Sequence, residues 1–321
     1  MRYHRSALSL LILSSLFLQA DEQLLTVEID GSPLIHYQAS PLPNPNGGEK
    51  FKGSNFIHPL KTPSGFTVTA SNPESHHHHH FGLWWPWKFI GVENNRQVLC
   101  WELQEGDGLI EARESTPHKN GFQAKSIYID RKARGGPRTI LNETVNVTTS
   151  DLLSSPVSGY WLDLEIINEV AGEEPLEIQK SLYSGFTLRG TEQWAGYKAT
   201  VLSSEGQIDE GDKWGENQGQ FISDINLTRA RWVRVEGPAP EGTAGVLLMS
   251  SPTNHNHPEK LRTWGNREIF INFNPVQEES WALEPGQKYI RNYRVFVYDG
   301  SLTGEQAEAL WQDFKTKQAQ G

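Results

Sequence analysis

The chain has a single cysteine, Cys100, among its 321 residues, so no intrachain disulfide can form. A small secreted module usually depends on such cross-links, and this chain must rely on a hydrophobic core instead. The segment around Cys100, residues 97–103, is typical of a buried strand. This setting favours a thiol packed in the core over a catalytic one.

Basic side chains are also few. The chain carries 29 Lys and Arg residues against 39 Asp and Glu residues, which gives a formal net charge of −10. Broad binding to nucleic acid requires a basic face that releases phosphate counterions, and docking on an anionic membrane requires the same sign of charge. The composition therefore excludes both as predicted partners.

Long apolar runs and the common enzyme motifs are missing as well. Beyond the N-terminal segment, no stretch reaches the about 20 apolar residues that a membrane-spanning helix needs. The sequence has no Gly-x-Ser-x-Gly elbow, no dinucleotide-binding glycine motif, no phosphate loop and no His-Glu-x-x-His. Serine hydrolases, kinases and nicotinamide enzymes thus have no support in the sequence.

The N-terminus has the features of a targeting segment. Arg2 and Arg5 precede an apolar run over residues 7–18, and Ala20 suits the position before a signal-peptidase cleavage site. We therefore predict a signal peptide over residues 1–20. The mature chain is expected to be exported, to the periplasm or the exterior of a bacterial cell.

Alternating apolar and polar residues between Gly, Pro, Asn and Asp turns are typical of strands, and this pattern recurs along the chain. Strands are predicted at residues 24–29, 65–70, 97–103, 124–130, 139–148, 160–167, 230–236, 243–250, 268–273 and 288–299. In residues 160–166 the carboxylates alternate with apolar side chains, which indicates a half-solvated antiparallel strand. Residues 40–54 and 205–219 are predicted to be long loops.

Only the C-terminus has a helical pattern. Thr303 and Gln306 form a capping box, and Ala307, Trp311 and Phe314 belong to one apolar stripe after it. The predicted fold is all-β. It is one large antiparallel β-sandwich domain over residues 21–321, and it ends in a helix over residues 303–319.

The most unusual feature is a run of five of the 11 histidines at residues 76–80. In an extended segment, His77 and His79 would share one face with their Cα atoms about 6.8 Å apart. Two imidazoles at that spacing can chelate one divalent metal ion, or they can supply an acid and a base near neutral pH. The alternative interpretation is an exposed polar loop.

Three tryptophans follow the histidines in a segment bounded by Gly and Pro: Trp84, Trp85 and Trp87. A flat indole offers an apolar face to a sugar ring, and its N–H can donate to a hydroxyl. We therefore consider Trp84 and Trp87 as carbohydrate-binding residues. For each of them, packing in the core is the alternative.

Four further positions carry polar groups of possible function. Arg189 ends an apolar stretch, where it either reaches into a cleft or forms an ion pair at a strand end. Glu205 is a turn carboxylate and a candidate general base, with a solvated turn as the alternative. His257, two residues after another histidine, either completes a site begun by His77 or shapes a turn before proline. Asn274 is predicted to lie on a strand.

At this point the chain resembles the PmoA-like family of exported bacterial proteins, labelled methane oxygenase PmoA. The resemblance runs from about residue 54 to residue 314 and is carried by residues 75–87, 183–189, 204–206, 230–233, 254–258 and 294–300. Near the histidines the family pattern is Asp-His-Pro-His-His-Arg-Gly-Leu-Trp. His76, His78 and Phe81 depart from it at the Asp, Pro and Arg positions.

The resemblance implies a β-sandwich of the kind that galactose mutarotase and several polysaccharide lyases share, and it carries Glu205 and His257 onto family positions. Methane oxidation does not follow, because a genuine subunit of that membrane enzyme needs apolar spans that this chain lacks.

These observations lead to one principal hypothesis. We expect an exported carbohydrate-active protein, an enzyme of epimerase, lyase or hydrolase type that acts on a glycan or a sugar derivative. The expected catalytic residues are His77, His79, Glu205 and His257, the expected substrate-binding residues are Trp84, Trp87, Arg189 and Asn274, and the expected ligands of one metal ion are His77, His79 and His257. The alternatives are a non-catalytic sugar-binding protein and a copper protein that performs redox chemistry.

Overall fold

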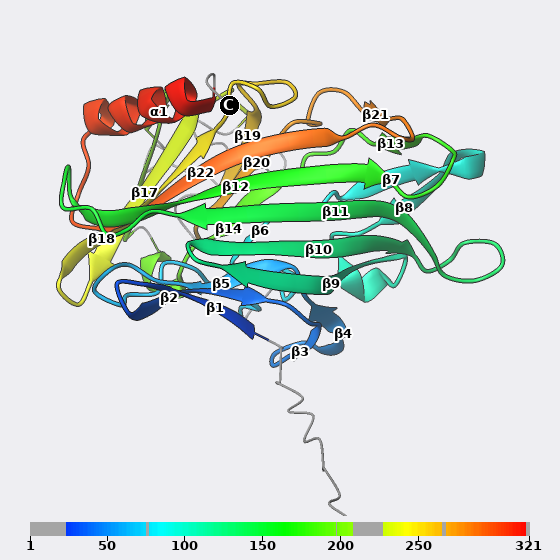
Figure 1. Ribbon diagram of the computed structural model, residues 1–321, viewed down its shortest axis with the longest axis horizontal. Coiled ribbons are helices and arrows are strands. Elements are labelled where there is room, and N and C mark those ends of the chain that lie inside the picture. Colours follow the sequence, from blue (N-terminus) through cyan, green and yellow to red (C-terminus); the bar gives the residue numbers. More distant parts are fainter. Residues whose placement is uncertain (1–23, 75–76, 197, 208–226, 265–267, 319–321) are drawn as a thin grey trace, which may run out of the picture.

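Two large antiparallel sheets, packed face to face, form the body of the protein in the computed structural model (Figure 1). The structure describes residues 24–74, 77–196, 198–207, 227–264 and 268–318. The predicted signal peptide lies outside these residues, as does most of the predicted loop at 205–219. Within the described chain, no helix is long and apolar enough to span a membrane.

The nine-stranded sheet lies in front in Figure 1. Its strands, in spatial order, are β16 (Gly206–Gln207), β15 (Thr200–Ser203), β17 (Trp232–Ala239), β18 (Gly242–Ser250), β22 (Tyr289–Asp299), β12 (Ser158–Val170), β11 (Arg138–Thr149), β10 (Gly121–Asp130) and β9 (Gly108–His118). The seven-stranded sheet behind and below it consists of β1 (Leu24–Ile29), β2 (Ser32–Gln38), β5 (Phe56–Leu60), β6 (Leu83–Trp84), β14 (Phe186–Arg189), β20 (Phe270–Asn274) and β19 (Lys260–Trp264).

Smaller elements complete the fold. A four-stranded sheet holds β21 (Trp281–Leu283), β13 (Leu176–Ile178), β7 (Phe89–Val92) and β8 (Arg96–Leu99), and a hairpin pairs β3 (Leu42–Asn44) with β4 (Gly48–Gly53). The described residues also form the short 3₁₀ turns η1 (Glu93–Asn95), η2 (Leu103–Glu105) and η3 (Glu192–Trp194) and the α-helix α1 (Gly304–Gln318). The predicted all-β sandwich with a C-terminal helix is therefore confirmed.

Strand β12 explains why the large sheets pack together. Tyr160, Leu162, Leu164 and Ile166 are buried between the sheets, and the residues between them are partly exposed. This alternation is the predicted one, and it follows from the two-residue period of a strand. The apolar side chains that point inward at alternate strand positions of both large sheets form one continuous core, which holds the sandwich together.

Helix α1 covers the other face of the nine-stranded sheet, over β17, β18 and β22 (Figure 1). The predicted capping box is present, since the Thr303 backbone N–H donates to Gln306 Oε1 at 2.8 Å and the Gln306 N–H donates to Thr303 Oγ1 at 3.1 Å. Trp311 and Phe314 are buried against the sheet. Burial of this stripe fixes the helix, because an isolated helix of this length is only marginally stable.

Three local predictions differ from the structure. Residues 65–70 form only isolated bridges, because their backbone groups bond to several different segments. The predicted strand at 97–103 ends at Leu99, and η2 begins at Leu103. Cys100 is a free, buried cysteine as predicted, and burial raises the pKa of its thiol. The predicted loop at 40–54 contains the β3–β4 hairpin.

Candidate functional site

The candidate site lies on the outer face of the seven-stranded sheet, away from the sandwich core. Along β6, β14 and β20, Leu83, Leu188 and Ile271 point into the core, so their neighbours Trp84, Arg189 and Phe270 point outward. The outward aromatic side chains form one buried group that we call the aromatic cluster: Phe56, Phe81, Trp84, Trp101, Trp264 and Phe270, with Tyr183 packed against it.

Next to the aromatic cluster the histidines form a tight turn. The His80 backbone N–H donates to the His77 carbonyl at 2.9 Å, and His77 has a left-handed φ of 55°. The His77 ring stacks on the His80 ring with centroids 4.8 Å apart, and the His79 ring lies 5.8 Å from His77. The run is therefore not extended, because this hydrogen bond folds it back. The turn still brings His77 and His79 together.

The surroundings of His79 keep its ring neutral. Burial, reinforced by the charges of His77, Lys88 and His78, lowers its pKa from 6.5 to about 3. At neutral pH one nitrogen of His79 is thus a hydrogen-bond acceptor with an available lone pair. Trp264 lies against the His77 ring, with centroids 5.0 Å apart.

A carboxylate fixed by a buried arginine stands beside His77. Glu268 Oε1 lies 3.8 Å from His77 Nδ1, which is an ion-pair distance rather than a hydrogen bond. The other oxygen of Glu268 pairs with the Arg189 guanidinium, which is fully buried and also pairs with Glu192 at 2.9 Å. Arg189 therefore forms an ion pair, one of its two predicted settings, and it holds Glu268 in place.

Backbone contacts join the histidine turn to strand β14. The Arg189 N–H donates to the Gly82 carbonyl at 2.7 Å. Gly82 itself has a φ of 50°, and a Cβ there would lie 2.4 Å from the Ile57 carbonyl oxygen. Only glycine fits this position. The segment after the histidines is thus locked against β5 and β14, which places the turn over the aromatic cluster.

His257 and Glu205 lie elsewhere. His257 precedes β19 at the end opposite Trp264, and the strand alone separates those ends by about 13 Å. Its Nδ1 is 3.3 Å from Ser250 Oγ and its ring stacks on Trp311 of helix α1. Glu205 pairs with Arg231 at 3.2 Å near the same helix. The expected joint site of His77, His79 and His257 is therefore not formed.

The predicted metal set receives no support from this arrangement. Among the described residues, no group of three or more His, Cys, Asp and Glu side chains is placed to hold a metal ion. His77 and His79 are close, but His257 is held by Ser250 and Trp311 at the other end of β19. Their donor atoms thus do not fit one tetrahedral centre.

Three of the predicted substrate-binding residues serve the fold. The Trp87 ring is fully buried, donates to Asn168 Oδ1 at 3.1 Å and lies under the Arg291 guanidinium. Asn274 is buried, donates to the Ser181 carbonyl at 2.7 Å and accepts from the Val276 N–H. Trp84 is 4% exposed and packs between His80 and Trp101, so little of its ring can reach a ligand.

The pocket beside Trp84 is small. It is lined by aromatic and apolar side chains, Phe56, Phe81 and Trp101 among them, and its free volume of about 20 Å³ corresponds to one water molecule. A sugar ring cannot enter it. A ligand of that size must instead lie over the more exposed rim, where Tyr183 and the histidine turn are found.

Comparison with known families gives one match. The model of DUF6807, a family of unknown function, matches residues 24–312. The chain belongs to the DUF6807 family. This match connects the DUF6807 chain neither with PmoA nor with methane oxidation, so the resemblance noted in the sequence stays a prediction. A search of the curated proteins finds no match.

Solved structures similar to the DUF6807 chain include three of the GH36 α-galactosidase AgaA from Geobacillus stearothermophilus. The first has a TM-score of 0.40 and 11% identity, over 87% of this chain and 41% of the enzyme. A variant in complex with raffinose has a TM-score of 0.34 and 12% identity, over 82% of this chain and 34% of the enzyme. A variant in complex with 1-deoxygalactonojirimycin has a TM-score of 0.36 and 11% identity, over 83% of this chain and 39% of the enzyme. The DUF6807 chain thus spans less than half of that enzyme, and no function is transferred from it.

Several site residues of the DUF6807 chain escaped the sequence analysis. Trp264 ends β19 and Glu268 lies two residues before β20, and no motif marks either residue. Lys88, Tyr183 and Arg262 meet over the aromatic cluster although they are far apart in the sequence. Tyr183 begins the segment 183–189, which carries part of the family resemblance. That resemblance was the sequence feature that could have indicated this rim.

Proposed function

We propose that the protein is an exported carbohydrate-active enzyme that transfers protons on a glycan or sugar derivative at the histidine turn. The observation that carries this proposal is the pairing of two nearby imidazoles with different surroundings. His79 is kept neutral by burial and by neighbouring charge, and His77 stands beside a carboxylate. Paired groups whose environments differ in this way are typical of an acid and a base.

The proposed mechanism assigns one role to each group. The neutral nitrogen of His79 accepts a proton from the substrate, and protonated His77 donates one to the oxygen that gains charge or leaves. Burial and the charge of His77 both lower the pKa of His79, which suits the two rings to different roles. Glu268, held by Arg189, keeps His77 in position. Epimerisation, β-elimination and hydrolysis all use such a pair.

A second candidate, a sugar-binding protein without catalysis, is favoured by the pKa of His79. A base works best when its pKa lies near the working pH, and the pKa of His79 is about 3. In this alternative the imidazoles and Tyr183 supply hydrogen bonds and an aromatic face to a bound sugar.

Turnover of a polysaccharide panel tests the proposal. We expect the purified mature chain to release reducing ends or unsaturated products, or to invert a stereocentre seen by NMR. His79→Gln and His77→Asn should each lower kcat by about 100-fold or more, since general acid–base catalysis contributes that much. Asn is chosen at position 77 because it tolerates the left-handed backbone there.

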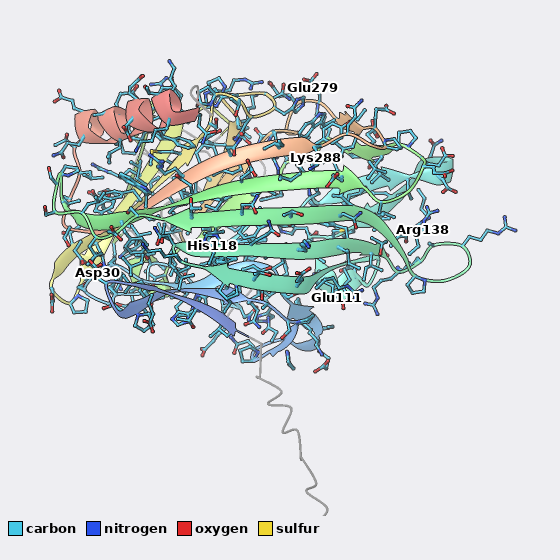
Figure 2. All side chains as sticks on the ribbon, in the orientation of Figure 1. Asp30, Glu111, His118, Arg138, Glu279 and Lys288 are labelled. Atoms are coloured by element: carbon cyan, nitrogen blue, oxygen red, sulfur yellow. The ribbon has the colours of Figure 1, made fainter. Side chains whose placement is uncertain are left out.

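The matched control is His118→Gln. His118 is exposed at the end of β9, an edge strand of the nine-stranded sheet, and Figure 2 labels it. This variant should keep full activity. Turnover that survives in both His77→Asn and His79→Gln contradicts the proposed mechanism. Glycan binding without any turnover in the wild type establishes the binding protein instead.

A further inference from the structure

A second group of polar side chains surrounds Tyr183 at the rim of the aromatic cluster. Lys88 Nζ lies 5.2 Å and Arg262 Cζ 5.1 Å from the centre of the Tyr183 ring. Arg262 also donates to the Tyr183 hydroxyl at 3.0 Å, and Lys88 pairs with Glu102 at 2.6 Å. The Trp264 ring lies 6.0 Å from the Tyr183 ring and 5.0 Å from the His77 ring between centroids, so this rim adjoins the histidine turn.

Arg262 differs from the other buried arginines. Arg189 pairs with Glu268 and Glu192, Arg291 lies 3.9 Å from Glu143, and Arg294 lies 2.5 Å from Asp163. Arg262 is only 8% exposed, yet no carboxylate among the described residues lies within ion-pair distance of it. A buried charge without a counter-charge is costly, so an anionic partner would stabilise this guanidinium beyond what the Tyr183 hydroxyl provides.

The neighbouring tryptophan has an open donor on the same face. Arg262 and Trp264 are two residues apart on β19, so both side chains point outward from the sheet. The Nε atom of Arg262 and the Nε1 atom of Trp264 are both buried, and neither has an acceptor within the described chain. Two N–H donors beside Tyr183 therefore lack acceptors.

We propose that Arg262 and Trp264 bind the carboxylate of an acidic sugar, a uronic acid residue, and so select the substrate of the histidine turn. This inference rests on the proposed function and names its substrate class. A planar carboxylate accepts two parallel hydrogen bonds from a guanidinium, and the Tyr183 ring offers a face to the sugar. Glu102 at the same rim disfavours a more highly charged group such as a phosphate dianion.

Ligand-induced thermal shift and calorimetry test this inference with matched pairs: galacturonate against galactose, glucuronate against glucose, each as free sugar and as short oligosaccharide. Inorganic sulfate serves as an anion without a sugar. We expect the uronates to bind at least about 10-fold more tightly than their neutral partners. Arg262→Met should remove this preference, because a hydrogen bond between charged groups is worth about 10- to 100-fold in affinity.

The free protein gives a second, independent readout. Arg262→Met removes an uncompensated buried charge, so it should leave the thermal midpoint unchanged or raise it. Arg294→Met is the matched control, and it should lower the midpoint because it leaves Asp163 without its arginine. A loss at Arg262→Met as large as that at Arg294→Met means a structural cation and overturns the inference.

The binding outcomes separate the inference from the proposed function. Equal binding of uronates and neutral sugars, unchanged by Arg262→Met, overturns the uronate site and leaves a carbohydrate-active protein intact. Sulfate that binds as well as the uronates, with no binding of neutral sugars, overturns the sugar specificity. Absence of binding by every sugar overturns both.

Discussion

The two carboxylates that pair with Arg189 differ in burial, and this difference predicts different effects on stability. The Arg189 side chain is fully buried, the Glu268 side chain is 12% exposed and the Glu192 side chain is 54% exposed. Glu268→Gln leaves the buried guanidinium facing a neutral amide, which should cost about 2–3 kcal/mol because hydrogen bonds to buried charges are worth that much. Glu192→Gln removes a solvent-screened partner and should cost less than about 1 kcal/mol.

Thermal denaturation followed by tryptophan fluorescence measures this contrast. At about 2–4 °C of midpoint per kcal/mol, Glu268→Gln should lower the midpoint by about 4–12 °C and Glu192→Gln by less than about 4 °C. The double variant Arg189→Met/Glu268→Gln should be more stable than Glu268→Gln alone, because it removes a buried charge whose remaining partner, Glu192, is screened by solvent. Equal losses in the two single variants would refute the reasoning, since burial would then not decide the strength of these ion pairs.

Other predictions concern the rest of the fold. Burial lowers the pKa of His58 and of His257 from 6.5 to about 4, so the unfolded chain binds more protons than the folded chain between these two pH values. The thermal midpoint should therefore fall as the pH is lowered from 6.5 to 4. His58→Gln should reduce this fall, and a pH profile that this variant leaves unchanged contradicts the assignment. Asn274→Ala should lower the free energy of unfolding by about 1–3 kcal/mol, because the Ser181 carbonyl and the Val276 N–H lose their partner, and an unchanged stability would contradict this structural role. Thr303→Ala should cost about 1 kcal/mol through the lost cap of α1, whereas Thr303→Ser should keep most of it.

Local patterns in the sequence were enough to predict the body of the fold. The alternation in residues 160–166 and the capping box at Thr303 depend on neighbours within a few positions, and both are present in the structure. Residues 65–70 have the same kind of alternation but form no regular strand, because their backbone partners come from several segments that the sequence does not show together.

The site was harder to predict, because it depends on contacts across the fold. The histidine run indicated the right segment, but its turn geometry comes from a backbone bond and from packing over the aromatic cluster. Arg189 was found, but its partner Glu268 carries no local signal. The prediction that His257 joins His77 and His79 was wrong. The similar spacing of these histidines does not show that His77 packs near Trp264, at one end of β19, while His257 precedes the other end.

Successive side chains along a strand of the seven-stranded sheet alternate between the sandwich interior and the outer face. On β19, Leu261 packs in the sandwich interior and Arg262 faces outward; on β20, Ile271 and Phe270 divide in the same way. A slip of one residue in the pairing of either strand would exchange the two sets, placing a guanidinium in the core and a leucine at the rim. Packing of the interior and the composition of the outer face thus depend on the same pairing, and a misregistered chain would lose both at once.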